Sequence, residues 1–569
     1  MKPEFLTRIR IISRIIFFIA LVLFGRLYFI QVMHGGEFSD EADRQYTRPN
    51  QSLYNRGSVY LKDKDGRLVS GATLKSGFIV VINPKILVDA KTAYEKLSGL
   101  IEIDEDTFFL RAGKKSDTYE EIAKHIDSDT AHIIEELDID GVDIYKDRWR
   151  FYPGKTLASQ TLGFVGYIGD EFSGRYGLER YYNDLLERGG DSMYVNFFAE
   201  IFANINSTVF KSGNRSGDVV TSIEPSVQLF LEKKLQEIST DWNSKLSAGV
   251  IIDPRNGEIR AIGVNPSFDV NNFQDQEDAS IFLNPIVENV YEMGSIIKPL
   301  TMAAGIDAGA VTATTTYYDA GKIELSDYTI SNFDGKGRGR VSMQEVLNQS
   351  LNTGVAFVTS RMGNRVFADY MLSYGVADET GIDLPNESAG LVDNLNSPRD
   401  LEYATASFGQ GIAMTPIAMI RALSVLANGG TLITPHIAKK IKYTSGLSKN
   451  VSFNDGERVL KQESAEEITR MLVNVVDDAL LGGTVALPNY SIAAKTGTAQ
   501  IARIGERGYY DDRFLHSFFG YFPAYDAEYL IFLYTLEPKE VRYASQTLTH
   551  PFIDTVKFLI NYYEIPPDR

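Results

Sequence analysis

An unbroken apolar run lies close to the N-terminus. No polar side chain interrupts Ile15–Phe24, and Leu27–Ile30 extend the run after Gly25 and Arg26. As a helix, residues 11–30 would span about 30 Å, the thickness of a bilayer core. Cations precede the run at Lys2, Arg8, Arg10 and Arg14. This charge order predicts an anchor at 11–33 that leaves tail 1–10 in the cytoplasm and exports the rest.

Two other interpretations of this segment are weaker. A cleaved signal peptide would need a small-x-small site after the apolar run, and Gln31-Val32-Met33-His34 contains none. A buried globular helix is disfavoured by the basic residues ahead of the run. We therefore predict an uncleaved, single-pass anchor.

The exported part alternates between strand-like and helix-like patterns. Apolar or alternating runs predict strands at Phe78–Ile82, Val219–Ile223, Ala248–Asp253, Glu258–Val264, Ser491–Ala494, Ser517–Phe522 and Glu528–Leu536. Helical patterns cover Lys114–Leu137, Pro225–Ile238, Ser342–Gln349, Pro416–Ala427 and Glu463–Ala479. The turn dipeptide Asn256-Gly257 joins two of the runs as a hairpin.

The order of these elements predicts the fold class. Asn206–Gly217 is rich in Ser, Asn and Gly and is typical of a linker. Beyond it, strands come first, helices follow and strands return, which predicts one α+β domain closed by bringing its ends together. We place a membrane-proximal domain at 34–239 and a second domain at 240–569.

Composition removes several kinds of chemistry. The 569 residues include no Cys, which excludes thiol nucleophiles, disulfides, iron–sulfur clusters and Cys zinc sites. The 6 scattered His disfavour a His-ligated catalytic metal. The formal net charge of −18 disfavours nucleic-acid binding, which needs a basic surface. We expect no metal, no cofactor and no nucleic-acid partner.

Ser295-Ile296-Ile297-Lys298 fits the pattern S-x-x-K. On a helix, Lys298 lies one turn after Ser295 on the same face. A neutral lysine can remove the proton of a serine hydroxyl and make it a nucleophile. Gly294 permits a tight entry that would place Ser295 at a helix N-terminus, where backbone N–H groups favour developing negative charge.

Lys495-Thr496-Gly497-Thr498 follows a predicted strand, where a cation, a close-approach glycine and a strand edge can receive an extended peptide. The same K-[ST]-G pattern at Lys75-Ser76-Gly77 and Lys211-Ser212-Gly213 is interpreted as incidental. Ser350-Leu351-Asn352 is a candidate S-x-N beside a helix end. For Ser350 and Asn352 alone, helix capping is an equally good explanation.

In this order the three motifs resemble those of penicillin-binding proteins of the monofunctional class B type, which are peptidoglycan transpeptidases. The resemblance extends along most of the chain. It includes Arg56-Gly57-Ser58-Val59-Tyr60 with Asp65-Gly66, Arg150, Tyr152-Pro153, Gly177-Leu178-Glu179, Asp253-Pro254, Pro266-Ser267-Phe268, Tyr291 to Ser295, Gly409-Gln410-Gly411 and Thr415-Pro416. Met293 stands where the family usually has Pro, and Leu351 stands where S-D-N has Asp.

The resemblance implies an anchor, an elongated mixed α/β pedestal at 34–239, and a transpeptidase domain with a central antiparallel sheet and an all-helical subdomain. It also implies a mechanism. Ser295 attacks the penultimate D-alanine of a stem peptide with Lys298 as base, and Ser350 and Asn352 relay a proton and hold substrate. Lys495 and Thr496 bind the carboxylate end, Gly497 and Thr498 also bind substrate, and the N–H groups of Ser295 and Thr498 form the oxyanion hole.

The implied partners are peptidoglycan stem peptides, β-lactams, the membrane and a polytopic glycan polymerase of the division or elongation machinery. The implied location is the bacterial cytoplasmic membrane with the catalytic domain outside. The Phe514–Pro523 segment favours the division type. Alternatives are a silent β-lactam-binding scaffold or sensor, a D,D-carboxypeptidase, or a β-lactamase.

Overall fold

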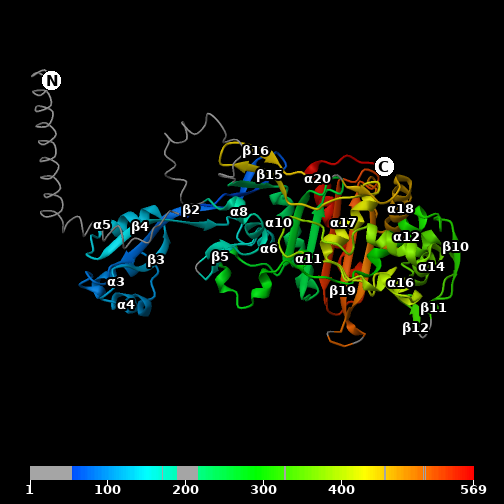
Figure 1. The fold of residues 1–569 in the computed structure, drawn as a ribbon, viewed down its shortest axis with the longest axis horizontal. Coiled ribbons are helices and arrows are strands. Elements are labelled where there is room, and N and C mark those ends of the chain that lie inside the picture. Colours follow the sequence, from blue (N-terminus) through cyan, green and yellow to red (C-terminus); the bar gives the residue numbers. More distant parts are fainter. Residues whose placement is uncertain are drawn as a thin grey trace, which may run out of the picture. The chain divides into compact units, whose positions relative to one another are not determined.

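The computed structural model describes residues 54–169, 171–188, 216–325, 328–453, 456–503, 505–506 and 508–569 (Figure 1). The anchor expected at 11–33 and most of the expected linker Asn206–Gly217 lie outside the described residues. Within the described ranges, no helix combines the length and the apolar character that a membrane crossing needs.

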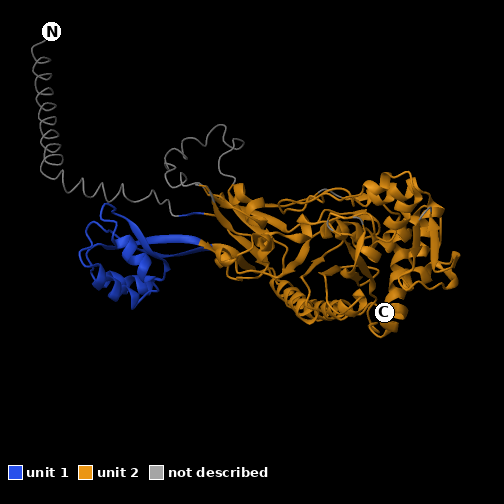
Figure 2. Ribbon diagram, turned by 90° about the horizontal axis from the view of Figure 1, so that it is seen from below, with its two compact units in different colours: residues 1–55, 74–149, 189–195 blue, residues 56–73, 150–188, 196–569 orange. Residues whose placement is uncertain are grey.

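The chain forms two compact units (Figure 2). Of the described residues, unit 1 contains 54–55 and Leu74–Trp149, whereas unit 2 contains Arg56–Thr73, Arg150–Arg188 and those from 216 to 569. The units are therefore assembled from interleaved segments of the chain. The domain boundaries expected at 34–239 and 240–569 stay a prediction.

Unit 1 is a small α+β body. Its elements are the end of β2 (Leu68–Ile82), α3 (Ala90–Ser98), α4 (Glu105–Ala112), β3 (Glu120–Ile126), α5 (Ser128–Glu136) and most of β4 (Val142–Phe151). The helix expected over Lys114–Leu137 is wrong in its first half, because β3 pairs antiparallel with β2. Ile122 and Ile126 of β3 pack against the buried core there, and this pairing overrides the helix propensity of its Glu, Ala and Lys residues.

The central sheet of unit 2 has five antiparallel strands in the order β18-β19-β20-β8-β9. Their bounds are β8 (Leu246–Ile252), β9 (Ile259–Asn265), β18 (Ala493–Ala502), β19 (Tyr509–Phe522) and β20 (Tyr529–Leu536). Strands from the two ends of the domain thus lie side by side, which confirms the expected closure. The β8–β9 hairpin turns at Gly257, whose φ is +86°.

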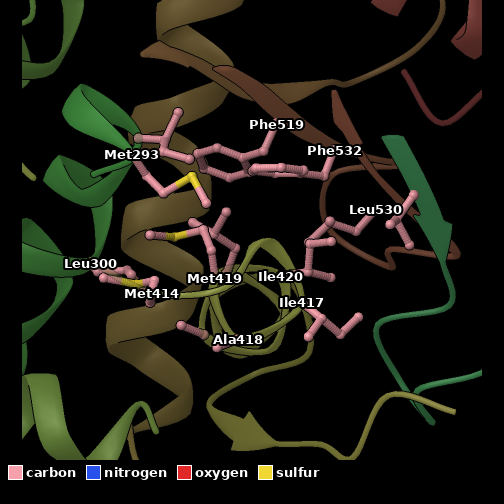
Figure 3. Close-up of a cluster of buried hydrophobic side chains, with 14 of the residues drawn as sticks. Met293, Leu300, Met414, Ile417, Ala418, Met419, Ile420, Phe519, Leu530 and Phe532 are labelled. Carbon is pink, nitrogen blue, oxygen red and sulfur yellow. The ribbon is translucent and has the colours of Figure 1, made fainter. Parts of the chain in front are cut away.

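The two faces of this sheet bury two different cores. Phe518 and Phe522 point toward α10 (Pro225–Asp241) and α20 (Thr549–Tyr563), whereas the neighbouring Phe519 belongs to the larger core on the other face. That larger core includes Phe532 and the side chains of α17 (Pro416–Ala427), as Figure 3 shows. Because successive side chains of a strand point to opposite faces of the sheet, the apolar run of β19 contributes to both cores.

Helices cover the larger core in unit 2. They are α11 (Pro285–Glu288), α12 (Lys298–Asp307), α13 (Met343–Asn348), α14 (Asn352–Met362), α15 (Asn364–Ser373), α16 (Asp400–Ala406), α17 and α18 (Gln462–Asn474). The expected all-helical subdomain is incorrect in detail, because two two-stranded sheets lie between α12 and α13. One pairs β10 (Thr316–Asp319) with β13 (Gly339–Ser342), and the other pairs β11 (Lys322–Leu325) with β12 (Tyr328–Ser331). The buried Asp319 carboxylate accepts the N–H groups of Gly321 and Arg338 and thereby fixes these turns.

A second group of strands in unit 2 runs in the order β16-β15-β7-β1, followed by the start of β2. The bounds are β1 (Val59–Lys62), β7 (Gly217–Thr221), β15 (Ala438–Tyr443) and β16 (Ser448–Asn450). Shorter elements complete the unit: α6 (Ser159–Leu162), β5 (Val165–Ile168), β6 (Glu171–Gly174), α7 (Gly177–Tyr181), α8 (Asn183–Leu186), β14 (Thr431–Leu432), β17 (Glu457–Arg458) and α19 (Ala544–Thr547).

The residues that carry the N-terminal part of the family resemblance meet in one buried ion cluster of unit 2. Arg56 Nε donates to Glu179 Oε2 at 2.7 Å, and Arg150 Nε donates to Glu179 Oε1 at 2.6 Å. The Tyr152 hydroxyl also donates to Oε1, at 3.3 Å. The Glu179 side chain has 0 % exposure and each arginine side chain has 2 %. Three separate stretches of chain are held together by this one carboxylate.

Candidate active site

The nucleophile candidate lies in a short 3-10 turn. Gly294–Ile297 form this turn and lead directly into α12, so Ser295 precedes the helix and Lys298 is its first residue. The Lys298 N–H donates to the Ser295 carbonyl and closes the turn. The expected relation of Ser295 and Lys298, one turn apart, is therefore present, with a tighter first turn than an α-helix.

Met293, the residue before the turn, attaches the turn to the core and to β19. The Met293 side chain is fully buried and lies in the cluster of Figure 3 with Phe519 and Phe532. The Met293 carbonyl accepts the Ser517 hydroxyl of β19 at 3.0 Å. A methionine thus takes the place of the family's usual proline by anchoring the turn through its side chain in the core.

The loop that contains Gly409 and Gly411 makes further contacts with the turn. The Gly294 N–H donates to the Gly409 carbonyl at 3.3 Å. Gly409 has a φ of +84°, and a Cβ there would lie 2.3 Å from the Gly294 carbonyl oxygen, so only glycine fits. Glu292 Oε1 accepts the Gly411 N–H at 3.0 Å and the Tyr509 hydroxyl at 3.1 Å, while burial raises the pKa of Glu292.

Both lysines reach the same hydroxyl. Lys298 Nζ donates to Ser350 Oγ at 3.1 Å and to the Ser350 carbonyl at 2.5 Å. Lys495 Nζ donates to Ser350 Oγ at 3.0 Å and to the Thr496 carbonyl at 3.0 Å. Ser350 lies between α13 and α14 with a φ of +52°, in the left-handed region. Three separated motifs therefore converge on one oxygen atom.

The environment of the two lysines disfavours their charged forms. Lys298 has no solvent exposure and Lys495 has 4 %. Burial, together with the nearby Lys495 charge, lowers the pKa of Lys298 well below its ordinary value. Burial also lowers the pKa of Lys495 to about 7. Two cations that share one hydroxyl partner repel each other, so a neutral amine is available at neutral pH for proton abstraction.

A cleft of about 620 Å³ joins the site residues. Ser295, Ser350, Asn352, Lys495, Thr496 and Thr498 all line it, whereas Lys298 lies buried behind Ser350. Lys495 to Thr498 belong to β18, the edge strand of the central sheet. An edge strand leaves backbone groups free to pair with an extended peptide.

The capping alternative for Ser350 and Asn352 is wrong. Leu351 occupies the N-cap of α14 and no side chain caps this helix. Asn352 Nδ2 instead donates to the Ser331 carbonyl at 2.8 Å, which fixes Asn352 on the cleft wall. Leu351 itself is fully buried, so the middle position of this motif packs in the core and not on the cleft wall.

Gly497 completes the contact between β18 and the nucleophile turn. A Cβ on Gly497 would lie 2.4 Å from Ser517 Oγ and 2.8 Å from the Met293 carbonyl oxygen. Among the other K-[ST]-G matches, Lys75-Ser76-Gly77 lies on β2 in unit 1, and Lys211-Ser212-Gly213 lies outside the described residues. Tertiary position thus separates the motif at Lys495 from the copy at Lys75.

Several residues of the cleft carry no sequence signal. Phe333, Tyr543 and Arg542 line it from loops, and Ser517 and Tyr509 support the turn from β19. The position of Ser517, a small hydroxyl residue at the start of the run Ser517–Phe522, is the sequence signal that could have indicated its role. The loop residues could be found only from the folded chain.

Comparison with known proteins agrees with this geometry. A family model described as the penicillin binding protein transpeptidase domain matches residues 247–556, more than half of the chain. A second, described as the penicillin-binding protein dimerisation domain, matches residues 53–218.

Similar proteins span nearly the whole chain. Stage V sporulation protein D of Bacillus subtilis is 28% identical over 544 residues, which cover 94% of this chain and 82% of that protein. A peptidoglycan D,D-transpeptidase FtsI homolog of Mesostigma viride is 26% identical and covers 96% of this chain and 94% of its own length. The crystal structure of penicillin binding protein 2X from Streptococcus thermophilus shares the fold, with a TM-score of 0.73 at 20% identity over 90% of this chain and 81% of that one.

Proposed function

The chain belongs to the penicillin-binding protein transpeptidases, and we propose that its reaction runs through an acyl-enzyme on Ser295. It is a peptidoglycan D,D-transpeptidase of cell-wall synthesis, acts on peptidoglycan and binds β-lactams. One observation carries the assignment of residues: the Ser350 hydroxyl contacts both Lys298 and Lys495 in the cleft that Ser295 lines.

In the acylation step, Ser295 Oγ attacks the carbonyl carbon of the penultimate D-alanine. Its proton passes to the neutral amine of Lys298, whose two N–H groups are directed to Ser350 and whose lone pair stays free. The N–H groups of Ser295 and Thr498 stabilise the oxyanion. The peptide C–N bond then breaks, and the terminal D-alanine leaves with a proton supplied through Ser350.

In the transfer step, the amine of a neighbouring stem peptide attacks the ester carbon. The C–O bond to Ser295 breaks, the hydroxyl recovers its proton, and a new amide bond joins the two stems. Lys495 and Thr496 hold the carboxylate end of the donor before acylation, Gly497 lets its backbone approach, and Asn352 lines the same wall.

This assignment is tested with the purified full chain in detergent, a donor ending in D-alanyl-D-alanine and an amine acceptor. We expect release of one D-alanine, an ester adduct on the peptide that contains Ser295, and an amide-linked product, all visible by mass spectrometry. Formation of hydrolysed donor alone would identify a carboxypeptidase, and rapid turnover of β-lactam would identify a β-lactamase.

The pH dependence of acylation tests the coupling between the two lysines. The Lys495 charge lowers the pKa of Lys298, so Lys495→Met should raise that pKa. A base with a higher pKa loses its proton at higher pH, so the acid limb of the acylation profile moves upward. The acylation rate of Ser295 by fluorescent penicillin against pH measures this limb, independently of the lower overall rate of the variant.

Arg338→Gln is the control for this shift, because Arg338 lines the same cleft but is hydrogen-bonded to Asp334 and Gln349. It should leave the acid limb where it is. A limb that stays in place or moves downward in Lys495→Met would show that Lys298 is not the base.

The anchor and its location are part of the same proposal. A single helix at 11–33 holds the catalytic domain outside the bacterial cytoplasmic membrane, supported by basic residues that precede an apolar run. It also binds a polytopic glycan polymerase. Exchanging 11–33 for an unrelated single-pass helix should leave penicillin labelling intact and reduce cross-linking in cells, measured by muropeptide composition. Unchanged cross-linking would contradict the partner role.

The division role is the finer proposal. Its support is the Phe514–Pro523 segment, together with similar proteins that carry the name FtsI. Depletion followed by microscopy should produce filaments; round cells would assign the protein to elongation instead.

A further inference from the structure

The charges on the cleft all have one sign. Among the described residues that line it, the charged ones are Arg338, Lys495 and Arg542, with no carboxylate. The whole chain has a formal net charge of −18, so this cationic lining is a local departure from the average. A cleft of this kind favours an acidic ligand.

Two of these cations already have polar partners. Arg338 makes a two-pronged ion pair with Asp334 at 2.7 and 2.8 Å, and Lys495 donates to Ser350. Arg542 is exposed and makes no ion pair with any residue that the structure describes. Its guanidinium carbon lies 5.8 Å from the centre of the Tyr543 ring. Arg542 is thus the cleft cation with a free charge.

Hydrogen bonds from β18 and β19 fix the backbone of the loop that contains Arg542. The fully buried His516 contacts the Arg542 carbonyl through Nε2 at 3.1 Å and Thr547 Oγ1 through Nδ1 at 3.0 Å. Burial lowers the pKa of His516 to about 4, so the ring is neutral and its Nε2–H donates to the carbonyl. The Ala544 N–H donates to Thr498 Oγ1 at 3.1 Å. The loop is therefore attached to the end of the motif on β18.

The direction of the donor follows from the proposed function. If Lys495 and Thr496 hold the terminal carboxylate and Thr498 faces the reacting carbonyl, the donor runs antiparallel to β18. Residues before the reacting D-alanine then continue past Thr498 toward Gln500, with a rise of about 3.3 Å per residue. Gln500, Arg542 and Tyr543 line the cleft, and the loop that carries Arg542 joins β18 at Thr498 through the Ala544 N–H. Tyr543 also contacts Phe333 edge-on at 5.8 Å between ring centres.

We propose that Arg542 is a specificity residue that binds a side-chain carboxylate on the stem residue immediately before the penultimate D-alanine. The subsite is formed by the Arg542 guanidinium, with the loop held by His516 and by Thr498. It selects acidic donors over donors whose side chain at that position is neutral. This inference rests on the proposed function, because the direction of the donor does.

The test uses the purified full chain in detergent and two synthetic donors that differ only at this residue, one with a carboxylate and one with the matching amide. D-Alanine release yields kcat/KM for each. Since an ion pair between exposed groups changes an equilibrium by up to about fivefold, wild type should prefer the carboxylate donor by about two- to fivefold. Arg542→Gln should lose this preference by slowing on the acidic donor alone, and Arg338→Gln should retain it.

Penicillin acylation of Ser295 separates loss of the subsite from a general structural defect, because a fluorescent penicillin with an uncharged acyl side chain offers Arg542 no carboxylate. Arg542→Gln should be acylated as fast as wild type, which supports a subsite role rather than a general structural one. Equal loss on both donors, a retained preference in Arg542→Gln, or no preference in wild type would each overturn the subsite while leaving the proposed function in place. Failure of wild type to release D-alanine from either donor would overturn the proposed function itself.

Discussion

Ser295→Ala should abolish covalent labelling of the protein by fluorescent penicillin. The substitution removes only the oxygen atom that would form the ester, and no other described residue offers a hydroxyl at this position of the turn. A nucleophile loss of this kind costs at least about 10³-fold in the rate of the chemical step. The measurement is in-gel fluorescence after a fixed time, with intact-mass analysis to count adducts.

Ser331→Ala is the matched control for this experiment. Ser331 lines the same cleft, is exposed, and takes part in the site only through its backbone carbonyl, which accepts from Asn352. This variant should label like wild type. Equal labelling of Ser295→Ala, with an unchanged melting temperature, would refute the acyl-enzyme assignment.

Glu179→Gln should produce the largest loss of stability among single polar substitutions in unit 2. The variant keeps the size of the side chain but removes the carboxylate that pairs with both Arg56 and Arg150 in the buried cluster. Breaking a buried ion pair by removing one partner costs about 3–5 kcal/mol, because the remaining charge is desolvated and uncompensated. The free energy of unfolding should fall by that amount.

The two tryptophans make this measurement specific to one unit. Trp149 belongs to unit 1 and Trp242 to unit 2, so in a Trp149→Phe background the fluorescence of Trp242 follows urea unfolding of unit 2. Glu467→Ala is the control, since Glu467 pairs with Arg470 on the surface and should cost less than about 1 kcal/mol. A Glu179→Gln midpoint no lower than the control would mean that the cluster contributes little net stability.

The local patterns predicted the elements whose own residues decide their structure. The Asn256-Gly257 hairpin, the helix beginning at Pro416 and the strand before Lys495 were found because turn chemistry and apolar period are readable over a few residues. The segment Glu120–Ile126 was not found, since its strand forms only by pairing with β2 about forty residues earlier. The short strands between α12 and α13 were not predicted either, since the buried Asp319 at the end of β10 accepts the N–H groups of both Gly321 and the distant Arg338.

In the candidate site too, local motifs could be predicted from the sequence, whereas contacts between distant segments could not. The sequence alone indicated Ser295, Lys298, Ser350 and Lys495, because their motifs follow one another in a meaningful order. It could not show that both lysines donate to Ser350, since this requires α12, β18 and the turn before α14 to meet. Arg542 and His516 belong to no motif, so their contribution became visible only when their loop was placed beside Thr498.

For this protein, the sequence by itself determined the chemistry, the class of fold and the family, because residue types and their order record which groups are available. The tertiary structure decided which copies of a pattern matter, which charges are buried, and which cation stays free on the cleft. The physical reason is that pKa shifts, ion pairing and cleft shape depend on burial and distance between groups far apart in the chain, and these arise only when the strands and helices pack.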